Sequence, residues 1–214
     1  MERNTFYSCP NCSTAHTVSL EEAFLIVCRV CSVMIFSESV VGAEPVKAEP
    51  VPEDWSFLKI GSAGIYKEQP FTIVGRIRLQ LRNDYKNFWS AVYSTGKCLW
   101  IAESFGSFSV FTTSWERYTK SPSKLRADKS IQLNEDIAVR GEYVERCERL
   151  RFEGEIGQWP ALHRGFFVIQ ASNNNGETAM FTVHKKENVY ILTGEKVARE
   201  NLKLTNILEW DEWK

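Results

Sequence analysis

Two pairs of cysteines near the N-terminus constrain the fold of this chain more than any other feature. Each pair has the spacing Cys-x2-Cys, and fifteen residues separate the pairs, whose members are Cys9, Cys12, Cys28 and Cys31. This spacing is typical of a short β-ribbon in which two tight turns, called knuckles, present four thiolates to one tetrahedral zinc ion. Residues 13–27 are long enough to go out and return as a hairpin. The sequence therefore predicts one zinc ion held by these four cysteines.

Four sulfur ligands complete the coordination of zinc and leave no position for water or substrate, so we expect a structural ion. Residues 1–36 bury too little apolar surface to fold alone, and zinc binding would supply the missing stability. His16 lies between the knuckles and could in principle replace a cysteine as a ligand, but with four thiols available we expect an ordinary residue of the ribbon surface. The alternative to zinc is two disulfides, which need an oxidising compartment.

The rest of the sequence favours a soluble protein in the reducing cytoplasm. The chain has 214 residues, of which 43% are hydrophobic and 25% charged, as is ordinary for one or two soluble domains. Its longest apolar stretch, residues 23–36, contains Arg29 and is shorter than the roughly 20 residues of a spanning helix. No basic region followed by an apolar core is visible at the N-terminus. We expect Cys98 and Cys147 to be small buried residues.

The chain divides by composition into four parts. Residues 1–36 form the predicted ribbon, and residues 37–54 carry three prolines and several acids, which favours an extended, solvated linker that tethers the ribbon. Residues 55–206 form the predicted β-domain, and residues 207–214 form a tryptophan-containing tail.

Alternating apolar residues predict that the β-domain is built from short strands. Phe71, Ile73, Ile77 and Leu79 recur at alternate positions, and Gly75 interrupts them, which indicates a bulge or bend. Similar runs follow along the chain, separated by turns such as residues 173–176 (NNNG), whereas helix signals are few. The sequence therefore predicts a mainly β protein: the zinc ribbon plus an antiparallel β-sandwich or partly open barrel, which two similar halves could form.

Several motifs give the β-domain a family resemblance. They are residues 58–62 (LKIGS), 71–76 (FTIVGR), 100–103 (WIAE), 154–160 (GEIGQWP) and 193–195 (TGE), with Trp89 and Tyr190. With these motifs the chain resembles an uncharacterised bacterial domain family whose members often carry an N-terminal zinc ribbon. Its genes often lie beside phage-shock-A-like and polyamine-synthase-like genes. The family tends to have an acid where this chain has Ala91, and usually glycine after the first knuckle, where this chain has Ser13.

The resemblance implies a shared fold and not a shared reaction, because its motifs are mostly structural glycines and tryptophans. Its gene neighbours imply a partner in a membrane-stress or envelope-maintenance assembly, which is an inference by association. The three histidines, at positions 16, 163 and 184, lie in unrelated contexts, and no hydrolase elbow, phosphate loop or zinc-protease pair is visible. Glu103, Glu153 and Glu155 are scattered over strands, where acids are usually structural. An enzyme of unknown class stays an alternative, with convergence of Glu155 and His163 in a pocket as its test.

A basic segment offers a second function. Residues 55–127 carry eleven basic and four acidic side chains, whereas the ribbon has more acids than bases and is a poor reader of nucleic acid. Arg76, Arg78, Arg82 and Lys86 are interleaved with aromatic residues and could bind nucleic acid or an anionic surface, including a membrane periphery. The alternative is that they keep a sheet surface soluble or pair with acids of neighbouring strands, and this structural interpretation is favoured.

These observations favour a non-catalytic zinc-binding adaptor or scaffold that binds a protein partner. Trp210 and Trp213 stand three apart, so on a helical turn they would share one face and could dock into a groove of the partner. The alternative is that the tail folds back and the two indoles complete the core of the β-domain.

Overall fold

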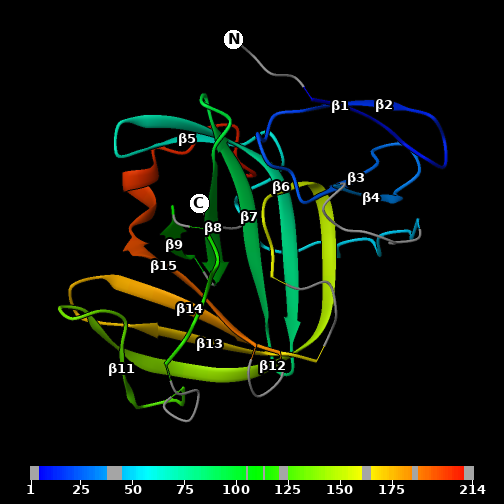
Figure 1. The fold of residues 1–214 in the computed structure, drawn as a ribbon. Coiled ribbons are helices and arrows are strands. Elements are labelled where there is room, and N and C mark those ends of the chain that lie inside the picture. The colour runs from blue at the N-terminus through cyan, green and yellow to red at the C-terminus, as the bar shows by residue number, and fades with distance from the viewer. Residues whose placement is uncertain are drawn as a thin grey trace.

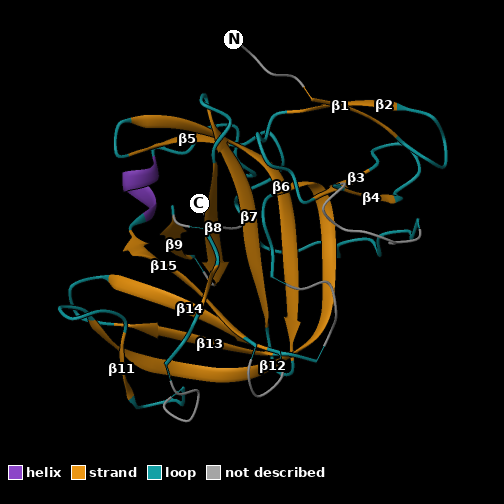
Figure 2. Cartoon of the chain, viewed as in Figure 1, coloured by secondary structure: helices purple, strands orange, loops and turns teal. Residues whose placement is uncertain are grey.

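A computed structural model describes residues 5–37, 45–104, 106–112, 114–120, 125–160, 165–184 and 188–209. Within these residues the chain is mainly β, and its one helical element is the short 3-10 helix η2 (Arg199–Leu202) (Figure 2). None of its helical segments in this part is long and apolar enough to cross a membrane. The mainly β fold class predicted from the alternating pattern is confirmed.

Two antiparallel meanders form the body of the molecule (Figure 1). The first consists of β6 (Gln69–Leu81), β7 (Tyr85–Tyr93), β8 (Cys98–Ser104) and β9 (Ser107–Phe111), and the second of β12 (Ala138–Ile156), β13 (Phe167–Ser172), β14 (Glu177–Val183) and β15 (Val189–Val197). Strand β9 pairs with β15 and β6 pairs with β12, so the pairings form a closed ring. The two meanders share β12, which pairs with β13 over residues 140–146 and with β6 over residues 147–154, and this arrangement agrees with the predicted antiparallel barrel.

Glycines permit the close contact between β6 and β12. The register of β6 against β7 shifts between Ile73 and Gly75, so the bulge expected at Gly75 is present. Gly75 is directly opposite Gly154, where a side chain on either residue would strike backbone. A Cβ at Gly75 would lie 2.1 Å from the carbonyl oxygen of Glu155, and a Cβ at Gly154 would lie 2.2 Å from that of Val74. The bend therefore depends on both glycines.

A continuous apolar core fills the barrel. Its large aromatic side chains come from both meanders and their connections: Phe88, Trp100, Phe111, Phe152, Trp159 and Phe166. The outer face of the first meander is covered by β5 (Ala63–Tyr66) and by Leu58 and Leu202. The outer face of the second is covered by β11 (Ser130–Gln132) and Leu125, while β10 (Glu116–Arg117) pairs with β15.

The cysteine-bearing segment forms two hairpins. Strand β1 (Thr5–Ser8) pairs with β2 (Ala15–Val18), and β3 (Leu25–Val27) pairs with β4 (Met34–Phe36). Each knuckle is the turn of its own hairpin. This differs from the single hairpin expected over residues 13–27, because β2 and β3 belong to different sheets.

The ribbon is packed against the barrel and is not a tethered module. Strand β3 extends the barrel sheet by pairing with the end of β12, where Ile156 is opposite Leu25. The backbone N–H of Glu21 donates to the carbonyl of Gly96 at 2.8 Å, and that of Phe24 donates to the carbonyl of Ile156 at 2.8 Å. An apolar cluster with residues from both regions, including Ile26 and Val92, lies beneath these bonds.

The expected solvated linker is also bound to the protein over its described residues, 45–54. Lys47 forms a bridge with Val33, and the backbone N–H of Met34 donates to the carbonyl of Val46 at 2.8 Å. The physical reason is that β4 is an edge strand with unpaired backbone groups, which this extended segment satisfies. Of the predicted tail, Trp210 and Trp213 lie outside the described residues, so their role stays a prediction.

Candidate metal centre

The two knuckles have the same backbone conformation. In the first, the N–H of Ser13 donates to the carbonyl of Cys9 at 2.9 Å, and in the second, the N–H of Ser32 donates to that of Cys28 at 2.8 Å. Ser13 and Ser32 both have positive φ angles, 58° and 60°. Glycine adopts such angles most readily, which is a physical reason for glycine after the first knuckle in the family that this chain resembles. In this chain serine adopts the positive φ angle in both knuckles.

The four sulfur atoms lie close enough together to hold one metal ion. All four are within 4.8 Å of one another, with 3.5 Å between the Sγ atoms of Cys9 and Cys31 and 3.6 Å between those of Cys12 and Cys28. Bonds of about 2.3 Å from a tetrahedral ion place sulfur atoms about 3.8 Å apart, close to these separations. A disulfide needs about 2.05 Å, and all six cysteines of the chain are free thiols. The spacing-based prediction of a four-cysteine cluster therefore agrees with the fold.

The knuckle backbone favours thiolate at part of this site. The N–H of Val33 lowers the pKa of Cys31 to about 6, and the hydroxyl of Thr14 lowers the pKa of Cys12. Burial raises the pKa of Cys9 to about 11. A metal ion would displace the protons from the remaining thiols, because the thiolate is the ligand. Burial likewise raises the pKa of Cys98 to about 11, as expected of an unreactive thiol.

His16 lies beside the four clustered cysteines and not on the ribbon surface. Its side chain is buried with 7% exposure, and its Nε2 is 3.3 Å from the sulfur of Cys28. Burial lowers the pKa of His16, which favours the neutral imidazole. A neutral ring with its proton on Nε2 can donate to the Cys28 thiolate and orient it. His16 and Val18 are two residues apart in β2, so both side chains point to the same, buried face. This spacing is the sequence signal that indicates the inward position of His16.

Glu155 connects the barrel to the ribbon. Its Oε2 accepts hydrogen bonds from the backbone N–H groups of Ser19 at 2.8 Å and Leu20 at 3.2 Å. Burial raises the pKa of this carboxyl. Its observed contacts are thus with the ribbon backbone, and His163, the proposed catalytic neighbour, lies outside the described residues.

The other two candidate carboxylates also have separate structural partners. Glu153 accepts a hydrogen bond from Nε of Arg76 at 2.7 Å, on the outer side of β6. Glu103 is buried and accepts from the indole N–H of Trp89 at 2.9 Å and from the hydroxyl of Ser56. The structure therefore does not bring these acids together.

Two of the four basic residues predicted for anion binding are already paired within the protein. Arg76 and Arg78 share a face of β6, but they are only 9% and 3% exposed. Both donate to the carboxylate of Asp54, which also accepts from the side-chain amide of Asn87 at 2.8 Å. Asp54, from the segment predicted to be a linker, and Glu153 of the neighbouring strand thus neutralise the two arginines, in agreement with the favoured structural interpretation.

The other two basic residues point elsewhere. Arg82 is exposed in the turn after β6. Lys86 belongs to the opposite face of β7 and lies in the barrel with 5% exposure, where its Nζ donates to the hydroxyl of Tyr143 at 2.6 Å and to Oε1 of Gln170. Burial lowers the pKa of Lys86 to about 8. The four residues therefore do not form one anion-binding surface.

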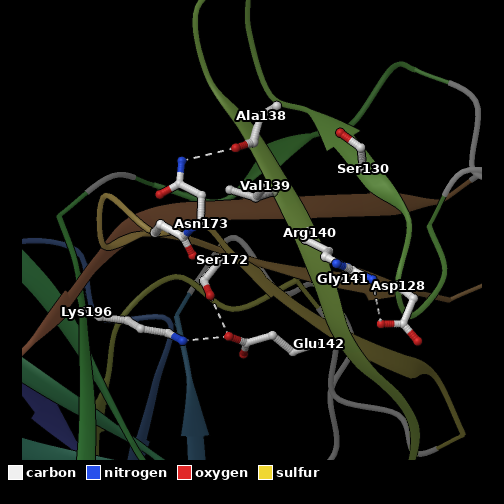
Figure 3. A pocket seen from close by; sticks show the side chains of 11 residues that line it. Asp128, Ser130, Ala138, Val139, Arg140, Gly141, Glu142, Ser172, Asn173 and Lys196 are labelled. Carbon is white, nitrogen blue, oxygen red and sulfur yellow. Dashed lines mark hydrogen bonds and ion pairs between the residues drawn. The ribbon is translucent and has the colours of Figure 1, made fainter.

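A polar hollow of about 830 Å³ lies where β12 begins and β13 ends (Figure 3). Its charged side chains are paired with one another: Lys196 donates to Glu142 at 2.5 Å, and Arg140 to Asp128 at 3.3 Å. Figure 3 shows the hydroxyl of Ser172 turned toward the same Glu142 carboxylate. The hollow is consequently neutralised by its own lining.

Comparison of the chain with protein-family models, curated proteins and solved structures found no match. The family resemblance stays a prediction from the motifs, and the function has to be argued from the geometry of the site.

Proposed function

We propose that this protein is a non-catalytic scaffold that a structural zinc ion stabilises and that binds a protein partner. The observation that supports zinc is the cluster of four thiols within 4.8 Å of one another on two matching knuckles. Thiolates in a tetrahedral arrangement favour zinc over hard ions such as magnesium and calcium. A site filled by four protein ligands stabilises a fold and leaves no position for chemistry on a substrate.

The ribbon is the part of the molecule that we expect the partner to contact. Val30, inside the second knuckle, is 66% exposed, and Val46, beside β4, is 52% exposed. Contiguous exposed apolar surface marks interaction sites, and these two valines are the exposed apolar residues that the described part of the ribbon and its adjoining segment could contribute to one. Because β3 pairs with the end of β12, the metal would fix this surface relative to the barrel.

For the partner we propose a component of a bacterial membrane-stress or envelope-maintenance assembly in the cytoplasm. Support for this class comes from the family resemblance of the β-domain motifs. A reducing compartment would keep the four cysteines available as metal ligands.

Elemental analysis tests the metal. Purified protein should contain close to one zinc per chain, and Cys28→Ser should lose it. Cys98→Ser is the matched control, because this free thiol is not among the four clustered cysteines. Retention of zinc by Cys28→Ser would remove Cys28 from the site.

Crosslinking followed by affinity capture in the native host tests the partner surface. The variant Val30→Ser should lose the captured protein, whereas Val144→Ser, which changes a 38% exposed valine of β12, should keep it. Equal capture by both variants would show that the ribbon is not the contact.

A further inference from the structure

A second hollow, of about 390 Å³, lies where the ribbon meets the barrel, and we call it the junction pocket. It is lined by Glu21, Glu22, Tyr93, Trp100, Trp115 and Gln158, among others. The bond from the N–H of Glu21 to the carbonyl of Gly96 holds the ribbon side of the pocket against the β7–β8 hairpin. Its volume is in the range of small-molecule sites.

Indole rings form one wall of the junction pocket. Trp100 and Trp115 both pack against Trp159, with ring centroids 5.5 Å and 5.1 Å apart. Trp159 is buried in the barrel core, so the two lining rings rest on a fixed support. The negative faces of indole rings attract cations, and of the aromatic side chains tryptophan does so most strongly.

The wall also contains hydrogen-bond donors without acceptors. The indole N–H groups of Trp115 and Trp159 are buried, and neither has an acceptor among the residues that the structure describes. Buried polar groups nearly always have a partner. The N–H of Trp115 is covered in the structure, so the part of this lining residue that can meet a ligand in the pocket is not its donor.

The net charge of the lining residues favours a positively charged ligand. Glu21 and Glu22 contribute two exposed carboxylates from the ribbon, against one basic lining residue, Lys97. We propose that the junction pocket binds a small organic cation, an alkylated ammonium compound. The indoles and carboxylates would hold the ammonium group. This site goes beyond the proposed scaffold function.

Calorimetric titration of the full-length, metal-containing protein with choline tests the proposal. Choline should bind saturably and about tenfold more tightly than 3,3-dimethyl-1-butanol, its neutral isostere, which has the same hydroxyl but no charge. Tetramethylammonium, which has the charge without the hydroxyl, should bind about as tightly as choline. The proposal is overturned if choline does not bind saturably or if the neutral isostere binds equally well.

Variants locate the binding. Trp115→Leu should weaken choline binding about tenfold or more, and Glu22→Gln about two- to threefold, as for one exposed charge. The controls Trp55→Leu and Glu148→Gln change an exposed tryptophan and an exposed acid outside the pocket and should leave the affinity unchanged. Equal loss in variants and controls would place the binding elsewhere.

A measurement on the unmodified protein covers the case in which Trp115→Leu does not fold. In a ¹⁵N–¹H spectrum, choline should shift the indole N–H resonance of Trp115 more than that of Trp89, whose N–H is already bonded to Glu103. The reverse order would overturn the assignment.

Discussion

The ribbon and the barrel are held together by different forces. The barrel surrounds a continuous core with large aromatic side chains from both meanders, whereas the ribbon has a small apolar cluster in which the clustered cysteines themselves take part. A segment of this size gains too little from apolar burial to offset its chain entropy. The ribbon therefore depends on its contacts with the barrel, and under the proposed function a bound ion would supply what its small core does not.

Removal of the metal should separate the two regions most strongly. Structural zinc sites in small modules contribute roughly 10–16 kcal/mol of apparent binding energy, so a chelator should unfold the ribbon and leave the barrel folded. All seven tryptophans lie outside residues 1–36, so their fluorescence reports on the rest of the chain. Amide spectra recorded with and without chelator should show loss of the ribbon resonances while the cooperative fluorescence melt persists. Ribbon resonances that survive metal removal would contradict this.

The buried ion cluster of the barrel should give the next largest effect. Asp54→Ala leaves Arg76 and Arg78 buried without the carboxylate they share, and breaking such a cluster costs about 3–5 kcal/mol. Urea unfolding followed by fluorescence measures this cost. The control Glu49→Ala removes an exposed acid that contacts Arg151 and should cost less than about 1 kcal/mol. Similar values for the two variants would mean that Asp54 adds nothing to barrel stability.

Lys86 is the opposite case within the same barrel, because its hydrogen-bond partners, Tyr143 and Gln170, are neutral. Its pKa of about 8 is below the ordinary value of 10.5, so the unfolded chain binds this proton more tightly than the folded protein does. Below pH 8 the buried charge therefore lowers the free energy of unfolding by its full amount. This loss of stability becomes smaller as the pH rises from about 8 to 10.5. Lys86→Met should stabilise the protein by about 1–3 kcal/mol at pH 7, with Tyr143 and Gln170 still 3.1 Å apart and able to bond each other.

Urea unfolding of Lys86→Met and of wild type, each at pH 7 and pH 10, checks the direction of this pH dependence. Most other titrating groups contribute equally to both proteins, so they cancel in the stability difference between variant and wild type. The stability difference should shrink at the higher pH. A difference that is constant or grows with pH would exclude a buried charged lysine.

The contact between ribbon and barrel should give the smallest effect. Glu155→Ala removes one carboxylate that accepts two backbone N–H groups, at a cost of about 1–3 kcal/mol confined to the interface. Hydrogen exchange should become faster at Leu25 and Ile26 and stay unchanged in β7. The exposed acid Glu148 provides the control variant Glu148→Ala. Unchanged exchange at both residues of β3 would show that Glu155 does not hold the ribbon.

Local features of the sequence predicted local features of the structure. The four cysteines lie in two short knuckles, so spacing alone indicated their cluster, and alternation indicated the strands and the bend at Gly75. The pairing of Leu25 with Ile156 joins residues far apart in the sequence, and composition contains no signal for it. This is why the ribbon was expected to be tethered.

The basic segment shows the same limit for single side chains. Alternation correctly placed Arg76 and Arg78 on one face of a strand, but exposure depends on what covers that face. Asp54 covers it from a segment whose prolines and acids are typical of a solvated linker. Lys86 lies in the barrel because it belongs to the face of β7 that also carries the core residue Phe88. Only the closed ring of strands determines that this face points inward.

X-ray absorption at the zinc edge, on protein as purified, identifies the metal and the atoms bound to it. We expect zinc with four sulfur neighbours at about 2.3 Å and no nitrogen neighbour. His16 makes this test sharp, because its Nε2 lies only 3.3 Å from the Cys28 sulfur. A spectrum with three sulfurs and one nitrogen, or protein without stoichiometric zinc, would contradict a four-thiolate site as the element that holds the ribbon.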